Sequence, residues 1–494
     1  MSNALVIGAG VGGIATAIRL QLMGYQVAVY EKNGFPGGKL SEFRLGDYRF
    51  DAGPSLFTLP EQVDALFELA GKNPRSYFRY QALPVITRYF YPDGTRLDAF
   101  QDPEAFAVEV EQKTGEPAEK IRKLLRKSEK LYEITGHIFL ERSLHKFDSY
   151  WRKETLQSAL QLHKLDAFRS MHKANTATFN DQRIVQLFDR YATYNGSNPY
   201  QAPATLSIIP HLEHNLGAYF PEGGMYDIVK SLVKLAEELG VSFHYKQDIT
   251  RILHQQGKVI GIQTSAESIY ADLVVSNADI HPTYTRLLPD LSPPTQTLKQ
   301  AASSSALIFY WGMDRTFPDL DVHNIFFSGN YQAEFEAIWK QQSIYEDPTV
   351  YLYSSSKHCQ ADAPAGHENW FVMINVPADT GQDWAVLKTR ARAFILDKLE
   401  KMMDMELRSH IQVEETLDPT TIASRTSSHQ GALYGNSSNN MLAAFLRHPN
   451  FSRKLKGLYF CGGSVHPGGG IPLCLLSAKI TADLVRADRL QPVM

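Results

Sequence analysis

Cysteine is scarce in this chain of 494 residues, which contains three, at positions 359, 461 and 474. An odd, widely spaced set without a C-x-x-C pair offers no disulfide framework and no zinc site. We therefore expect no bound metal and a reducing compartment. A large charge of one sign is also missing, since the formal net charge is −3. The composition thus gives no reason to expect a nucleic-acid partner.

Long hydrophobic runs are absent as well. The longest, such as Ala306–Trp311 (ALIFYW), have the length of a strand and fall short of the roughly 18 residues that a membrane-spanning helix needs. The apolar N-terminus lacks the basic start of a signal peptide and is rich in glycine. We expect a cytoplasmic protein that does not cross a membrane. Its core should be large, because 44% of the residues are hydrophobic.

Glycine, in contrast, is concentrated in a few turns, and the first follows an apolar strand at the N-terminus. The sequence GAGVGG at positions 8–13 opens a helical pattern, and a second strand then ends on an acid, Glu31. In this pattern Gly8 permits a tight turn, Gly10 lets a pyrophosphate approach the backbone, and Gly13 lets helix and strand pack closely. The helix N-terminus attracts phosphate, and Glu31 accepts from ribose hydroxyls. The pattern predicts a dinucleotide site in a βαβ unit, although a glycine-rich turn of another α/β protein is the alternative.

Two further glycine-rich segments predict which dinucleotide binds. Gly37-Gly38-Lys39 places a cation and bare backbone just beyond Glu31, and HPGGGIPLCLLSAKI at 466–480 opens a helix expected at Cys474–Ala487. The N-terminus of that helix would offer free N–H groups to a polar oxygen. A flavin ring, which is negatively charged when reduced, needs such a second anchor, whereas nicotinamide does not. We expect FAD, with a purely structural turn as the alternative for the C-terminal loop.

The rest of the chain alternates strand and helix patterns without repeats. A polar end on the strand at Leu273–Asp279 is typical of ligand sites in α/β sheets. The expected elements are a hairpin at Arg88–Phe100, a mostly helical region from Glu104 to about Thr178, a helix at Ile228–Leu239, strands at Val241–Tyr245, Asp248–His254 and Val259–Thr264, strands dominating from Ser303 to Pro377, several helical segments from Asp383 to Met403, and a last strand at Gly457–Phe460.

One helical region carries a local positive charge. Lys113–Lys173 contains 14 Lys and Arg against 8 Asp and Glu. Apolar and aromatic residues are interleaved there: Ile138, Phe139, Leu140, Leu144, Phe147, Tyr150 and Trp151. A basic face with aromatic residues can dock on an anionic membrane surface. The alternative is a solvated face over an ordinary core.

Several of these motifs together resemble the carotenoid desaturases of phytoene-dehydrogenase type, from end to end of the chain. The segments that carry the resemblance are Gly8–Gly13, Glu31, Gly37-Gly38-Lys39, Asp51-Ala52-Gly53-Pro54, Phe220–Gly224, Ser276–Asp279 and Gly457–Ser477. The run Tyr191–Leu206 (YATYNGSNPYQAPATL) and the form HPGGGIPL are most similar to hydroxycarotenoid 3,4-desaturases. Val465, Gly469 and Lys39 depart from the residues usual in that family.

The resemblance implies an α/β fold in several parts. A discontinuous Rossmann-like FAD-binding domain would comprise residues 1–100, 206–285 and 441–494. Residues 101–205 would form a helical part facing the substrate and the membrane, and residues 286–440 a sheet-containing substrate domain. The implied reaction is 3,4-desaturation of a long acyclic 1′-hydroxycarotenoid by hydride transfer to flavin. The protein would act at a membrane surface, as a peripheral protein, with oxygen or a quinone as electron acceptor.

The resemblance also names the residues that would bind FAD. They are Gly8, Gly10, Gly12, Gly13, Glu31, Lys32, Gly38, Lys39, Gly53, Pro54, Ser55, Ile249, Asn277, Asp279, Gly463, Ser464, His466, Gly470, Ile471 and Pro472. No catalytic base is assigned, because a cofactor-binding or structural role suits Asp279 and His466 better. A hydroxylated end group would also need a polar receptor at the far end of the substrate tunnel, which the sequence does not locate.

Three other functions stay open at this point. A phytoene desaturase of the same family would add double bonds stepwise to phytoene. A flavin amine oxidase would turn over amines and hold them in an aromatic cage. A carotenoid or flavin carrier would bind FAD without reducing it. The aromatic-rich strands after Ser303 do not distinguish these functions, because core packing explains them equally well.

Overall fold

The fold is built around two large β-sheets, and the first is a five-stranded parallel sheet. The computed structural model describes residues 2–136, 140, 142, 143, 145, 166, 169–440 and 447–490. The sheet has the order β19-β13-β1-β2-β9, which are Leu458–Phe460, Leu273–Ser276, Asn3–Ile7, Gln26–Tyr30 and Ser242–His244. Its strands come from distant parts of the chain, so the Rossmann-like sheet is discontinuous in sequence, as expected.

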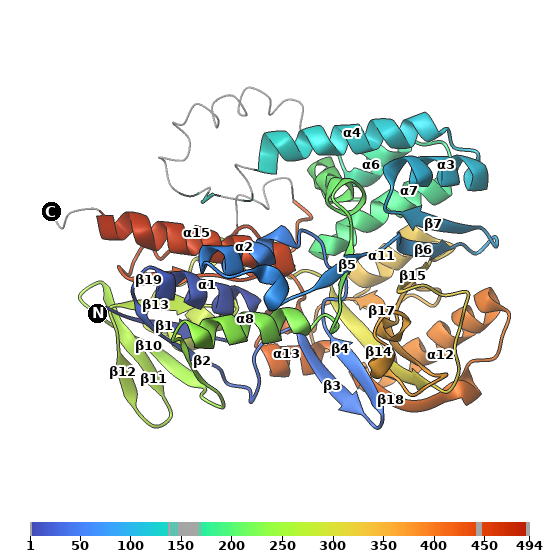
Figure 1. Cartoon of the computed structure of the whole chain (residues 1–494). Coiled ribbons are helices and arrows are strands. Elements are labelled where there is room, and N and C mark those ends of the chain that lie inside the picture. Colours follow the sequence, from blue (N-terminus) through green and yellow to red (C-terminus); the bar gives the residue numbers. More distant parts are fainter. Residues whose placement is uncertain are drawn as a thin grey trace.

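Layers of different kinds cover the two faces of this sheet (Figure 1). On one face lie α1 (Val11–Leu22), α8 (Asp227–Glu238) and α15 (Ile471–Leu490), and α1 contacts both other helices. On the other face lies the antiparallel sheet β10-β11-β12, formed by Ile249–Gln255, Lys258–Thr264 and Ser268–Tyr270. Ile252 and Val274 belong to the apolar core between the two sheets. The carboxyl ends of the parallel strands are left facing the rest of the molecule.

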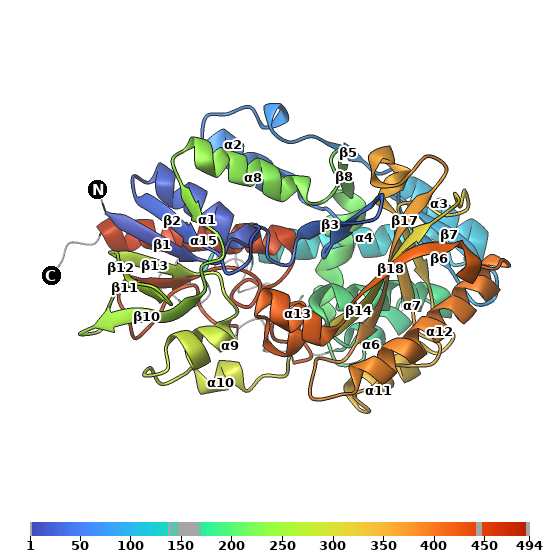
Figure 2. The same ribbon diagram turned by 90° about the horizontal axis from the view of Figure 1, so that it is seen from below.

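The second large sheet has seven strands. Its order is β18-β14-β17-β16-β15-β6-β7, which are Ile411–Leu417, Ser305–Met313, Glu368–Val376, Val350–Tyr353, His323–Phe326, Val85–Phe90 and Arg96–Phe100. Successive residues of a strand point to opposite faces. Leu307, Phe309 and Trp311 therefore pack beneath α12 (Trp384–Met403), on the outer face seen in Figure 2. Ala306 and Ile308 belong to the opposite, inner face.

Helices gather at the β6–β7 edge of the seven-stranded sheet (Figure 1). They are α3 (Pro103–Thr114), α4 (Ala118–Thr135), α6 (Met171–Thr176) and α7 (Gln182–Asp189), and they share one apolar core with β6 and β7. The interleaved residues Ile138, Phe139, Leu144, Phe147, Tyr150 and Trp151 lie outside the described residues. None of the helices within the described ranges is long and apolar enough to cross a bilayer.

Short elements join these layers. They are β3 (Ser41–Leu45), β4 (Tyr48–Ala52), α2 (Glu61–Leu69), β5 (Tyr80–Ala82), β8 (Tyr219–Pro221), α9 (Ile280–Pro282), α10 (Thr295–Leu298), α11 (Tyr331–Trp339) and α13 (Pro419–Thr426).

The expected mixed α/β class and most of the expected strands are present, but two predictions were wrong. The several helical segments expected after Asp383 are one uninterrupted helix, α12, because no residue within it breaks the backbone pattern. The closing helix begins at Ile471 rather than Cys474, because Pro472 is accepted in a first helical turn. The division into domains stays a prediction, although β6 and β7 are hydrogen-bonded into the seven-stranded sheet rather than the five-stranded one.

Candidate functional site

A cavity of about 810 Å³ connects the two sheets. One end lies among the glycine loops that follow β1, β2 and β19, and the other end lies on the inner face of the seven-stranded sheet. Most of the residues predicted for a cofactor line it: Gly8, Gly10, Gly12, Glu31, Lys32, Gly38, Lys39, Gly53, Pro54, Ser55, Ile249, Asn277, Asp279, Gly463, Ser464, Gly470, Ile471 and Pro472. Segments as far apart as residues 8 and 472 therefore meet around one space.

The first glycine loop is shaped for an anion. Gly8 has φ +93°, a left-handed conformation that suits the tight turn between β1 and α1. Gly10 is the N-cap residue of α1 and has no side-chain cap, so the first-turn N–H groups remain available to a ligand. Gly13 is not among the described residues that line the cavity. A Cβ there would lie 2.1 Å from the Gly8 carbonyl oxygen, so Gly13 permits the close packing of helix on strand.

Glu31 is held firmly at the end of β2. Its Oε2 accepts from the Ala9 N–H at 2.8 Å and its Oε1 accepts from the Asn33 N–H, also at 2.8 Å. The side chain is buried yet borders the cavity. Each carboxylate oxygen keeps a free lone pair, so Glu31 remains able to accept from two vicinal hydroxyls.

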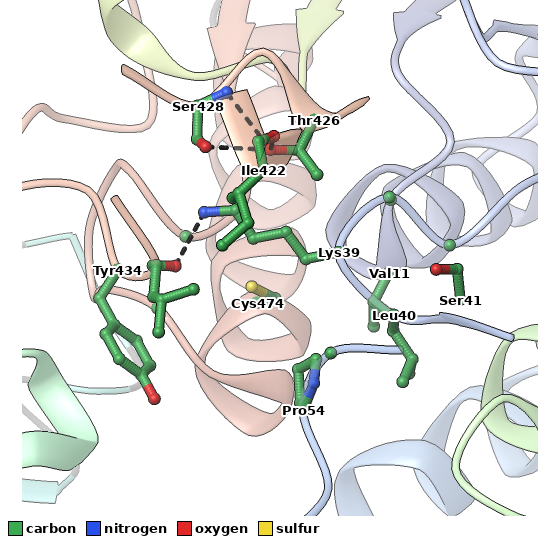
Figure 3. A pocket seen from close by; sticks show the side chains of 18 of the residues that line it. Val11, Lys39, Leu40, Ser41, Pro54, Ile422, Thr426, Ser428, Tyr434 and Cys474 are labelled. Carbon is green, nitrogen blue, oxygen red and sulfur yellow. Dashed lines mark hydrogen bonds between the residues drawn. The ribbon is translucent and has the colours of Figure 1, made fainter. Parts of the chain in front are cut away.

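A second part of the cavity lies between Lys39, Pro54 and the start of α15 (Figure 3). Lys39 reaches past Cys474, and its Nζ donates to the carbonyls of Ala432 and Leu433 at 2.7 and 2.8 Å. Burial lowers the pKa of Lys39. The two hydrogen bonds of Lys39 fix the 432–433 loop. In its charged form the lysine also adds positive charge beside the N-terminus of α15, which itself favours an anion.

Asn277 and Asp279 follow β13 beneath these loops. The Asn277 side chain fills the space that a Cβ of Gly10 or Gly462 would need, at 2.7 Å in both cases. Asp279 caps α9, and its Oδ1 accepts from the His281 N–H at 2.9 Å. Asn277 therefore shapes the glycine loops and Asp279 holds the start of α9, and both border the cavity.

His466 lies away from this space. It is not among the described residues that line the cavity, and its Nε2 is 2.8 Å from the Arg142 carbonyl. Burial lowers the pKa of His466 to about 4. A neutral histidine tied to a backbone carbonyl positions the C-terminal loop rather than exchanging protons with a ligand.

Two motifs that lie far apart in the sequence meet beside the site. The Asp51 carboxylate accepts from Arg49 Nη2 at 2.7 Å, from the Met225 and Tyr226 N–H groups at 3.0 and 3.1 Å, and from the Tyr353 hydroxyl at 3.1 Å. The backbone must approach Arg49 closely here, because a Cβ at Gly224 would lie 2.5 Å from Arg49 Nη1. Asp51 thus connects β4, the start of α8 and the seven-stranded sheet.

One wall of the cavity is a row of paired residues on the inner face of the seven-stranded sheet. Ile325, Tyr351, Met373, Ile308 and Leu417 are register partners from strand to strand, and all five line the cavity. Four are apolar, so this wall suits a long hydrocarbon.

Tyr351 is the polar exception in this row. Its hydroxyl lies 2.7 Å from Ser55 Oγ and 2.8 Å from His323 Nδ1. Sequence reasoning found Ser55 but missed Tyr351 and His323, because neither belongs to a recognisable motif. They lie in strands whose composition indicated only core packing.

A buried charged cluster forms another part of the wall. Arg190 donates to Tyr89 at 2.6 Å, to Tyr194 at 3.0 Å and to Glu213 at 3.1 Å, while Tyr191 and Tyr194 donate to Glu213. Arg190 and Tyr194 border the cavity. Burial alone would raise the pKa of Glu213, but Arg190, His214 and the tyrosine hydroxyls outweigh it, and that pKa is lowered. Sequence reasoning missed this cluster as well.

Comparison with known proteins shows that almost the whole chain matches one protein family. Residues 11–486 match the family model of flavin-containing amine oxidoreductases. The chain belongs to this family. Its cofactor is FAD, as the glycine loops predicted, and it is an oxidoreductase, as the resemblance to carotenoid desaturases implied.

Curated relatives within the family act on carotenoids. A 1-hydroxycarotenoid 3,4-desaturase of Flavobacterium sp. strain P99-3 is 50% identical over 485 residues, which cover 98% of this chain and 99% of the relative. A 4,4′-diapolycopene oxygenase of Methylomonas sp. is 33% identical, over 98% of both chains. The resemblance to carotenoid desaturases inferred from the motifs is therefore confirmed.

Solved structures show the same fold at low identity. An oxidoreductase from Methanosarcina mazei superposes with a TM-score of 0.64 at 15% identity, over 98% of this chain and 100% of the other. This likeness supports the architecture of the two sheets and says nothing further about the substrate.

Proposed function

We propose that this chain is an FAD-dependent carotenoid desaturase that introduces the 3,4 double bond into a long acyclic 1-hydroxycarotenoid. One observation carries the proposal: the space beside Lys39, Pro54 and α15 continues without interruption along an apolar wall of the seven-stranded sheet. The relative at 50% identity, a 1-hydroxycarotenoid 3,4-desaturase, supports this choice of substrate.

The residues of the cavity fit FAD. Bare glycine backbone, an uncapped helix N-terminus and a carboxylate with free lone pairs suit the pyrophosphate and the ribose of the ADP half. We assign Gly8, Gly10, Gly12, Glu31, Lys32, Gly38, Ile249, Asn277 and Asp279 to that half. Lys39, Gly53, Pro54, Ser55, Gly463, Ser464, Gly470, Ile471 and Pro472 would surround the ring, and Gly13 and His466 would support the loops from behind.

The chain itself has a limited chemical task. FAD, when bound, supplies the acceptor for the hydride that leaves an allylic C–H bond. Lys39 and the N-terminus of α15 would favour negative charge at the ring end. The apolar row holds the polyene and excludes water. The cation left on a conjugated chain is a strong carbon acid, so a weak base suffices to remove the neighbouring proton.

The locants in the relative's name refine the substrate expected from the sequence. We expected a 1′-hydroxycarotenoid, with the hydroxyl and the new bond at opposite ends of the polyene. Unprimed locants on both groups put them on the same end. The hydroxyl receptor would then lie near the ring end of the cavity and not at its far end.

The test of this function uses the purified protein with FAD in liposomes. Phytoene and a 1-hydroxylated acyclic carotenoid are supplied separately, and the products are separated by chromatography and identified by their visible spectra. A red-shifted product from the hydroxylated substrate alone is expected. Stepwise products from phytoene would instead identify a phytoene desaturase, and no new chromophore from either would refute desaturation.

The cofactor assignment has its own test in Gly10→Glu. The new carboxylate would enter the space proposed for the pyrophosphate, so bound FAD should be lost while the far-ultraviolet circular dichroism is kept. Gly34→Glu, at an exposed glycine that does not itself line the cavity although Asn33 and Phe35 beside it do, is the matched control and should keep its flavin. Full FAD occupancy in Gly10→Glu would contradict the assignment.

We also propose that the protein works at a membrane surface, since an acyclic carotenoid is held in lipid. The basic and aromatic segment within Lys113–Lys173 would make the contact, and oxygen or a quinone would take the electrons from the reduced cofactor. Co-sedimentation with anionic liposomes tests the contact, and it should weaken as salt is raised. Anaerobic reoxidation of the reduced protein by a soluble quinone separates the two acceptors.

A further inference from the structure

A 1-hydroxylated substrate sets a geometric requirement on the site. Four covalent bonds separate the hydroxyl oxygen from C4, so it lies within about 5 Å of the reacting carbons. The group that recognises it must therefore border the ring end of the cavity. An otherwise apolar wall must also provide a hydrogen-bonding partner there, because burying a hydroxyl without one costs free energy.

We propose that Ser55, Tyr351 and His323 are the receptor for the C1 hydroxyl group of the carotenoid. This inference rests on the proposed function. All three border the cavity. Ser55 directly follows Pro54, which stands at the ring end beside Lys39 and Cys474 (Figure 3). Tyr351 is half-buried and is flanked in its row by Ile325 and Met373, whereas His323 behind it is only 1% exposed.

The hydrogen-bond inventory of the three groups leaves room for a ligand. Tyr351 has one proton and two lone pairs, Ser55 has the same, and a neutral His323 contributes one donor and one acceptor. Burial keeps His323 neutral, since it lowers the pKa of that ring to about 3. Whichever of the three donates, the two observed bonds leave at least one lone pair of Ser55 Oγ free. His323 Nε2 has no partner among the described residues, so neither tautomer of the ring is favoured. The donors and acceptors along the chain from His323 through Tyr351 to Ser55 can therefore exchange roles.

The buried cluster at Arg190 is the competing receptor, and its bonds argue against it. The Tyr194 hydroxyl already accepts from Arg190 and donates to Glu213, so the hydroxyl that this cluster presents at the cavity wall has both its partners, although Arg190 Nε has none among the described residues. The three-residue chain at Tyr351 is instead anchored on Ser55, the residue next to the ring end. Tyr194→Phe therefore serves as a matched control, because it removes one hydroxyl from the cavity wall outside the proposed receptor.

The experiment compares two substrates in Tyr351→Phe. The holoenzyme is mixed without oxygen with a 1-hydroxylated acyclic carotenoid, or with the same polyene lacking the hydroxyl, and flavin bleaching gives a limiting rate and an apparent Kd. In Tyr351→Phe the Kd for the hydroxylated substrate should rise about tenfold, as loss of one hydrogen bond predicts. Its advantage over the plain polyene should fall by the same factor, while the limiting rate changes less. Tyr194→Phe should keep the ratio of the wild type.

The outcomes separate this inference from the function on which it rests. If the hydroxylated carotenoid does not reduce the wild-type flavin, the proposed function is wrong. If it does, and Tyr351→Phe keeps the full preference for the hydroxyl, the receptor is wrong. A collapse of the preference in Tyr194→Phe alone would move the receptor to the Arg190 cluster. Should Tyr351→Phe fail to retain FAD, Ser55→Ala decides by the same ratio.

Discussion

Glu213 is a carboxylate almost wholly withdrawn from water, and its ionised state depends on a few named partners. Arg190 and the hydroxyls of Tyr191 and Tyr194 hold it, and it is 1% exposed. A buried ion pair is weak evidence for stability by itself, but removal of one partner leaves an uncompensated charge. Arg190 and Tyr194 of the cluster form part of the wall of the cavity proposed for an apolar chain, so the rigidity of the cluster matters for the shape of the site.

We predict that Glu213→Gln loses about 3 kcal/mol of unfolding free energy at neutral pH, since Arg190 stays buried without its counter-ion. The pKa of Glu213 is lowered. The pair therefore stabilises the fold above the ordinary pKa of a glutamate and stops doing so as pH falls through the lowered value. The difference between wild type and variant should shrink below about pH 4. Urea denaturation at several pH values measures it.

The control for this change is Glu104→Gln. Glu104 pairs with Arg122 on the surface, with its side chain 60% exposed, and such pairs contribute little to stability. Its urea midpoint should match the wild type at every pH. A Glu213→Gln midpoint that also matches would mean that the cluster carries no net ionic stabilisation.

At the scale of elements, α15 is the helix whose N-terminus borders the ring end of the cavity. Leu473→Glu would add a carboxylate to its first turn. The change should stabilise the helix, because an acid there complements the dipole. It should also disfavour an anionic reduced cofactor and lower the midpoint potential of bound FAD by about 20 mV, taking about 1 kcal/mol for the charge.

Leu473→Gln is the neutral control for this variant. Redox titration against a dye of known potential gives the potential, and thermal melting gives the stability. The two readouts should move in opposite directions in Leu473→Glu only. An unchanged potential would show that the start of α15 does not act on the cofactor electrostatically.

Elements whose signal is local could be predicted from the sequence. The glycine loop of β1-α1-β2 carries a strand, a turn, a helix and an acid within about thirty residues, and HPGGGIPL similarly marks the start of a helix. Tyr351 and His323 carry no such signal, because their role arises only when β15 and β16 lie side by side and face Ser55. The pairing of Asp51 with Met225 and Tyr226 was hidden for the same reason.

Over the whole molecule, the two sheets are linked both by protein contacts and by the proposed cofactor site. Asp51 bonds the start of α8 to Tyr353 of the seven-stranded sheet, and the cavity takes its lining from both sheets. A ligand that occupies such a space binds only when both are folded, so it stabilises them together. The protein should therefore unfold as one unit when FAD is bound.

Two optical probes can test this prediction, because they report on different sheets. The chain has five tryptophans. Trp311 and Trp370 lie in the seven-stranded sheet, Trp339 and Trp384 lie in α11 and α12 beside it, and Trp151 is outside the described residues. Flavin fluorescence on release reports instead on the glycine loops of the five-stranded sheet. We expect tryptophan and flavin transitions to share one midpoint, and added FAD to raise both equally. If the flavin is released well before the tryptophan signal changes, and extra FAD moves only the first transition, the two sheets unfold independently and the cavity does not couple them.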